Sequence, residues 1–89
     1  MRRHLLVTND FPPKVGGIQS YLWELWRRLP SEDVTVHTTP YTGADAFDAD
    51  QDFTVSRSRE TVLLPTRSLL RRVRRLADGM DAELVVWDP

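Results

Sequence analysis

Two kinds of hydrophobic pattern alternate along this chain of 89 residues. Short apolar or alternating runs, typical of strands, occupy residues 4–8, 33–39, 53–57 and 83–87. Apolar residues at helical spacing occupy residues 18–29 and 69–77. Because strands and helices alternate, the pattern predicts an α/β domain with a mainly parallel sheet of about four strands and two helices.

The first predicted helix opens after Gly16-Gly17 and ends at Leu29-Pro30, since proline lacks the donor that a helix needs. One face of it is apolar and is expected to pack on the sheet. The residues of that face are Ile18, Tyr21, Leu22, Leu25 and Leu29. Trp23 falls outside this face, where lipid, a partner domain or solvent would meet it.

The second half of the chain is more polar. Residues 40–52 contain Gly43 and four aspartates and are expected to form a loop, which Phe47 and Phe53 hold to the body. Residues 61–64 are expected to be briefly extended. Thr66 or Ser68 caps the second helix, which runs to about residue 78, with Gly79 at the position that ends it.

The segment NDFPPKVGG between the first strand and the first helix holds the candidate chemistry. A glycine pair at a helix N-terminus lets a ligand approach the backbone closely. The first helical N–H groups have no partner within the helix and attract anions, most often phosphate. Alternatively, Gly16 and Gly17 merely allow a tight turn into the helix.

The whole loop is more specific than the glycine pair. DFPPKVGGIQSYLWEL resembles the N-terminal loop and first helix of glycosyltransferase family 4, the retaining GT-B sugar-nucleotide transferases. It is most similar to the actinobacterial GDP-mannose-dependent phosphatidylinositol mannoside mannosyltransferases. The similarity extends more loosely through FDADQDFTVSR and LLPT, and it covers about the opening quarter of a whole enzyme.

The resemblance implies a partial Rossmann-like domain, the acceptor-side N-terminal part of a GT-B enzyme, with strand order 3-2-1-4. Residues 1–89 would be truncated after the fourth strand. The parent enzyme would transfer a hexose, mannose from GDP-mannose, to a lipid-linked or polyol acceptor with retention. Neither the HG-type histidine stretch nor the paired glutamates of the C-terminal domain occur here. We therefore expect no catalytic residue in this chain, no activity from it alone, and a missing C-terminal domain as its partner.

Carried over by position, Gly16 and Gly17 would contact the donor diphosphate through backbone N–H groups. Gln19 would face the acceptor, and Asp10 would either contact the acceptor or serve as a turn carboxylate. Lys14 is interpreted as a solvated loop charge. The resemblance implies no metal and no cofactor beyond the nucleotide sugar.

Five arginines crowd the second helix, and a basic amphipathic helix can lie on an anionic lipid surface. They are Arg67, Arg71, Arg72, Arg74 and Arg75. A lipid-linked acceptor would make such contact useful, whereas the plainer interpretation is a solvated helix face.

The composition of the chain excludes several classes of function. Twelve Lys and Arg against thirteen Asp and Glu give a net charge of −1, so nucleic-acid binding is not expected. No apolar run is long enough to cross a bilayer and no secretory signal is visible, which predicts a cytoplasmic protein, peripheral at the inner face of the plasma membrane if the basic helix binds lipid. His4 and His37 are interpreted as structural, and no metal-ligand spacing occurs. A non-catalytic α/β module that binds phosphate groups or a partner protein remains the alternative.

Overall fold

The computed structural model describes residues 3–14 and 16–88. Four parallel strands form one sheet in the order β3-β2-β1-β4. The strands are β1 (His4–Thr8), β2 (Val34–Thr38), β3 (Thr54–Arg57) and β4 (Leu84–Asp88). The predicted fold class and strand order are confirmed, and β1 lies inside the sheet while β4 lies at one edge.

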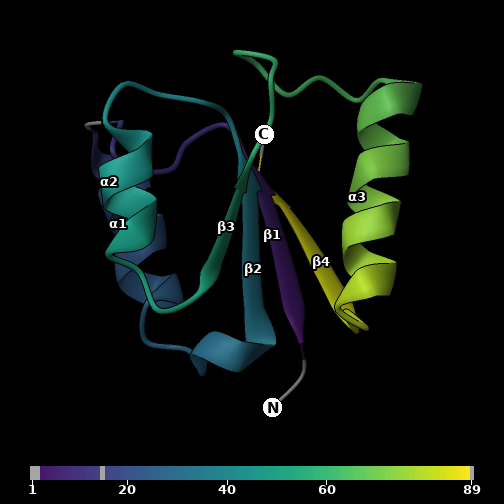
Figure 1. The fold of residues 1–89 in the computed structure, drawn as a ribbon, viewed down its shortest axis with the longest axis horizontal. Helices are drawn as coiled ribbons and strands as arrows, with labels where there is room; N and C mark the ends of the chain where they lie inside the picture. Colours follow the sequence, from purple (N-terminus) through teal and green to yellow (C-terminus); the bar gives the residue numbers. More distant parts are fainter. Residues whose placement is uncertain (1–2, 15, 89) are drawn as a thin grey trace.

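Helices cover both faces of the sheet. They are α1 (Gly17–Trp26), α2 (Ala44–Ala49) and α3 (Arg67–Gly79), and a single 3₁₀ turn spans Ser31–Asp33. Figure 1 shows α1 and α2 together on one face, with α3 on the other. The expectation of a loop at residues 40–52 was wrong, because α2 forms within it after Gly43, which adopts φ 84°.

Alternation along the strands divides the core into two layers. Leu6, Val34 and Val36 face α1 and α2, where Phe11, Leu22 and Phe53 complete the layer. Leu5 and Val7 face α3, and the buried residues of that layer also include Leu63, Leu69 and Val73. β1 therefore contributes to both layers, which is why its apolar run is uninterrupted.

The buried face of α1 differs from the predicted one. Leu22 is buried as expected, but Tyr21 is 65% exposed and Leu25 is 44% exposed. Trp26 packs against the core as expected, and Trp23, which was expected outside the buried face, packs there too. Aromatic rings opposite the helix explain the rotation, since Trp23 lies 6.3 Å from Phe47 between ring centroids. The helix also ends earlier than predicted, at Trp26, and Leu29 packs on the core from the following turn.

Helix α3 begins as predicted and ends differently. Thr66 caps it, and its Oγ1 accepts a hydrogen bond of 3.2 Å from the backbone N–H of Leu69. Gly79 is the last helical residue rather than the residue after the end; Met80 forms the C-cap, and Asp81 adopts φ 52°. The expected extended piece at residues 61–64 contains no strand.

Candidate functional site

The loop that links β1 to α1 lies at the carboxyl ends of the parallel strands. Ligands of open α/β sheets bind at this edge, outside the strand ends. Because β1 is an inner strand, its loop has the carboxyl ends of neighbouring strands on both sides. The predicted glycine site is therefore in the position where a site of this fold class belongs.

Neither glycine of the pair is required by its backbone angles. Gly16 is extended, with φ 164° and ψ 166°, a conformation that any residue adopts. Gly17, the first residue of α1, also lies outside the left-handed region, and a Cβ built on it would meet no atom within 4 Å. Gly17 therefore needs neither a special turn nor a close packing partner. The space that a side chain of residue 17 would enter is open.

Three hydrogen-bonded contacts set the start of the loop. The Asn9 side-chain amide pairs with Leu63 in both directions: its Nδ2 donates to the Leu63 carbonyl at 3.1 Å, and its Oδ1 accepts from the Leu63 N–H at 2.6 Å. The backbone N–H of Asp10 donates to Thr8 Oγ1 at 2.9 Å. Lys14 Nζ donates to the Asn9 carbonyl at 3.0 Å, so the interpretation of Lys14 as a merely solvated charge was wrong.

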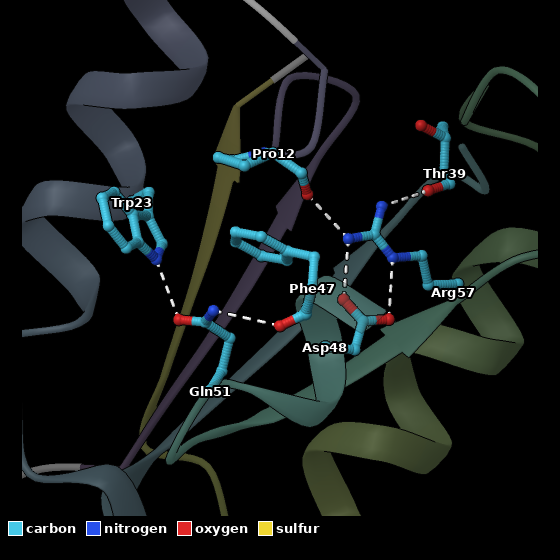
Figure 2. A network of polar contacts seen from close by, with 7 residues as sticks. All are labelled: Pro12, Trp23, Thr39, Phe47, Asp48, Gln51 and Arg57. Carbon is cyan, nitrogen blue, oxygen red and sulfur yellow. Dashed lines mark hydrogen bonds and ion pairs between the residues drawn. The ribbon is translucent and has the colours of Figure 1, made fainter. Parts of the chain in front are cut away.

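Arg57, at the end of β3, binds the middle of the loop (Figure 2). One of its Nη atoms donates to the Pro12 carbonyl at 2.7 Å, and the other donates to the Thr39 carbonyl at 2.8 Å. Asp48 of α2 accepts two hydrogen bonds from the same guanidinium, at 3.0 and 2.8 Å. The arginine thus joins β3, α2, the end of β2 and the loop.

Aromatic side chains support the loop from beneath. Phe11 is buried and meets Phe47 and Phe53 edge-on, each at 6.1 Å between ring centroids. Trp23, expected to meet lipid, a partner domain or solvent, is half-buried. It donates from Nε1 to Gln51 Oε1 at 2.9 Å, and Gln51 donates in turn to the Phe47 carbonyl at 3.0 Å (Figure 2). These contacts fix α2 against α1.

The predicted site residues fall in two places. Asp10, Gly16 and Gly17 share the β1–α1 loop and its junction with α1, and Asp10 is half-buried there. The Gln19 side chain lies outside the described part of the structure. The five arginines lie on α3, across the sheet from α1, so the structure does not bring them to the glycine loop (Figure 1).

Four of the α3 arginines are exposed: Arg67, Arg71, Arg74 and Arg75. Arg72 is half-buried and pairs with Glu60 at 3.2 Å. Arg74 approaches Asp78 at 3.9 Å on the exposed side, a geometry that contributes little. Arg72 is thus committed to a partner within the chain, and the other four present positive charge to the surroundings.

His37 is the most buried titratable side chain near this edge. Its Nδ1 lies 3.0 Å from Ser56 Oγ, and its Nε2 has no hydrogen-bond partner among the described residues. Burial lowers the pKa of His37 below its ordinary value; Arg72 lowers it further, and Glu60 opposes both. The backbone N–H of Glu60 and its hydrogen bond with Arg72 lower the pKa of Glu60. His37 is therefore held neutral inside the sheet, as a structural histidine would be.

Residues 3–14 and 16–88 contain neither a cluster of metal-ligand side chains nor a membrane-spanning helix. No three histidine or acidic side chains in this range converge as metal ligands would. No helix in this range has the length and apolar character needed to cross a bilayer.

Comparison with known proteins finds relatives that match nearly the whole chain. A protein of Mycobacterium tuberculosis (strain CDC 1551 / Oshkosh), named GDP-mannose-dependent alpha-(1-6)-phosphatidylinositol monomannoside mannosyltransferase, is 46% identical over 93 residues. The chain is homologous to part of the actinobacterial phosphatidylinositol monomannoside mannosyltransferases. The match covers 98% of this chain and 24% of that relative, so the chain spans about a quarter of its length.

Two further relatives agree. A Mycolicibacterium smegmatis protein of the same name is 40% identical over 87 residues, covering 93% of this chain and 22% of its own. A Corynebacterium glutamicum protein, named as acting on a monoacylated form of the same acceptor, is 42% identical over 67 residues. The match covers 73% of this chain and 18% of that protein. No family model matches the chain. The resemblance read from the loop is confirmed by these relatives.

The Arg57 network was not anticipated from sequence, although its members lie in a stretch that was noticed. Asp48 and Arg57 both belong to FDADQDFTVSR. The nine-residue separation of Asp48 and Arg57 matches no helical spacing, so the ion pair follows from how α2 packs beside the end of β3. The further bond of Arg57 to Pro12 depends on how the loop folds back over the sheet, which the pattern does not specify.

Proposed function

We propose that this chain forms the opening, acceptor-side part of a retaining mannosyltransferase that takes GDP-mannose as donor and a phosphatidylinositol mannoside as acceptor. The names of the three relatives support the donor and the acceptor class. The observation that carries the proposal is the open space at Gly17, on the first turn of a helix that begins at the carboxyl edge of the sheet.

In this proposal the groups of this chain bind and orient the donor and the acceptor, and they take no part in the chemical step. Backbone N–H groups at Gly16 and Gly17 donate to the donor diphosphate, whose charge the N-terminal end of α1 favours. The absence of a Cβ at Gly17 lets the phosphate oxygens approach the helix end. Asp10 and Gln19 face the acceptor. Further chain supplies the other wall of the cleft, the remaining nucleotide contacts and the exclusion of water.

We extend the proposal to the lipid surface that such an acceptor requires. Exposed apolar side chains occur on α3 itself and on the loop that precedes it: Leu70 on α3, and Val62 and Leu64 on the loop. Positive charge next to exposed apolar groups is typical of a surface that rests on anionic lipid. The parent enzyme would accordingly be peripheral at the inner face of the plasma membrane.

A chimera tests the transferase function. Residues 1–89 replace the aligned segment of the Mycobacterium tuberculosis relative, and mannose transfer from GDP-mannose to phosphatidylinositol monomannoside is measured. We expect transfer, and we expect Gly17→Val to lower kcat/KM by at least about tenfold, equivalent to about 1.4 kcal/mol of lost transition-state binding. Gly79→Val is the matched control, because Gly79 also lies in a helix and a Cβ there would also meet no atom within 4 Å.

The same chimera separates the two classes of function. A folded chimera without transfer, in a relative that is active before replacement, would contradict the transferase proposal. If such a chimera still bound pyrophosphate, the chain would be a non-catalytic phosphate-binding module. Equal losses from Gly17→Val and Gly79→Val would show that the substitutions act on helix stability rather than on ligand access.

A further inference from the structure

Arg57 occupies an unusual place for an arginine, because its charge lies mostly inside the protein. Its side chain is 11% exposed and that of its partner Asp48 is 22% exposed. The two carboxylate oxygens of Asp48 accept from Nε and one Nη, which fixes the plane of the guanidinium. The remaining donors then have set directions, toward the carbonyls of Thr39 and Pro12.

The contact with Pro12 reaches the loop from a residue 45 positions away in the chain. Pro12 is buried, so its carbonyl would lose water without gaining a partner if the arginine were absent. The preceding Phe11 is held between Phe47 and Phe53. Arg57 therefore binds the loop next to Phe11, which the core already holds in place. This point lies between Asn9, where the loop starts, and Gly16, where the loop ends.

We propose that Arg57, oriented by Asp48, is the positioning residue that sets where the Gly16-Gly17 amides lie relative to the sheet. The proposal rests on the function proposed for those amides, as the site for a diphosphate. Arg57 itself does not touch the ligand. It acts through the Pro12 carbonyl, four residues before Gly16, and the two-carbonyl, one-carboxylate arrangement requires the planar fork of arginine, which lysine does not have.

The first test concerns loop position and needs no ligand. Amide NMR spectra of the ¹⁵N-labelled chain are compared for the natural sequence, Arg57→Met and Arg57→Lys. We expect the amides of Asn9, Asp10, Phe11, Lys14, Gly16 and Gly17 to shift or broaden in Arg57→Met while those of β1 and β2 stay in place. Arg57→Lys should restore them only in part.

Two controls separate positioning from general stability. Arg28→Met removes an arginine that is 72% exposed and pairs with Glu24, and the loop amides should not respond. Val73→Ala weakens the core on the α3 side and should lower the melting temperature without moving the loop amides. Loop amides unchanged in a folded Arg57→Met, or moved equally by Val73→Ala, would overturn the proposal.

The second test adds inorganic pyrophosphate as the probe. We expect the shifts of the Gly16 and Gly17 amides on titration to require at least about fivefold more pyrophosphate in Arg57→Met than in the natural chain, since charge-assisted hydrogen bonds are the strong ones. Equal affinity in the two folded proteins would contradict the positioning role. If the natural chain does not bind pyrophosphate at these amides, the proposed function of the site fails, and the ligand-free spectra still decide whether Arg57 positions the loop.

Discussion

Gly17 and His37 show how a single residue can be assigned a role by what it lacks. Gly17 lacks both a left-handed φ and a neighbour that a Cβ would strike, so packing does not explain the glycine. His37 lacks a partner at Nε2 among the described residues and is nearly fully buried. The first absence leaves room for a ligand, and the second makes protonation costly.

The histidine leads to a prediction about pH. Because the folded-state pKa of His37 is lowered, the unfolded chain binds more protons near and below pH 6.5, so the free energy of unfolding should fall as pH drops below about 6.5. One titrating group contributes at most about 1.4 kcal/mol per pH unit. Urea unfolding at several pH values between 7.5 and 5 measures this, and His37→Gln should flatten the profile.

The carboxylate facing His37 needs its own control. The pKa of Glu60 is lowered, so protonation of Glu60 changes the free energy of unfolding only near and below pH 4.5, its ordinary pKa. This range lies below the pH range in which His37 titrates. Glu60→Gln should therefore leave the slope between pH 7.5 and 5 largely in place. If His37→Gln and the natural chain showed the same slope, the histidine would not be the cause.

At the scale of elements, hydrophobic periodicity predicted most of this fold and missed what depends on neighbours. The strands and α3 follow from local patterns: β-branched runs, the Thr66 cap and an apolar helical face. Helix α2 has only six residues and an acidic sequence, ADAFDA, so its sequence has no apolar face from which the helix could be predicted. The rotation of α1 toward Trp23 and Trp26 depends on Phe47 and Phe53, which come from distant parts of the chain.

The candidate site divides in the same way. The Gly-Gly loop was predictable because its residue types carry their chemistry locally. The Asn9–Leu63 pairing and the Arg57–Pro12 bond join residues 54 and 45 positions apart, and no local pattern specifies them. The sequence pattern predicts that a ligand meets the backbone at this loop, which stays a prediction, and the folded chain shows what holds that backbone in place.

Helix α3 carries the prediction about lipid. Replacing Arg67, Arg71 and Arg75 by glutamine should weaken binding to vesicles with anionic lipid by about 3 kcal/mol, since each basic residue near the surface contributes about 1 kcal/mol. Co-sedimentation with phosphatidylinositol-containing and neutral vesicles measures it. The control is Arg27→Gln with Arg28→Gln, which removes exposed charge just after the end of α1, the helix on the other face of the sheet. Equal loss from both sets would show a non-specific charge effect.

At the scale of the whole molecule, the β4 edge of the sheet carries exposed apolar side chains in the described structure. β4 pairs with β1, and its other edge has no partner strand among residues 3–14 and 16–88. Leu84, Val85 and Trp87 of this strand are each at least 37% exposed. An open apolar edge of this kind invites pairing with another chain.

We therefore expect the chain to associate as its concentration rises. Val85→Lys with Trp87→Lys should shift the sedimentation distribution toward monomer, because charged side chains on an edge strand oppose strand pairing. Tyr21→Lys is the control, since Tyr21 is exposed on a helix and away from the edge. Association that is unchanged by the β4 substitutions would place the contact elsewhere.

The proposed donor site consists of the backbone amides of Gly16 and Gly17, and a titration of the ¹⁵N-labelled chain with GDP-mannose tests them most directly. With about a quarter of the relatives' length present, we expect weak binding, with a dissociation constant on the order of 1 mM. We expect the Gly16 and Gly17 amides to shift more than any others in the described loop, and we expect Gly17→Val to abolish the response while Gly79→Val leaves it in place. A chain that responds to GDP-mannose elsewhere but not at these two amides would contradict the proposed donor site.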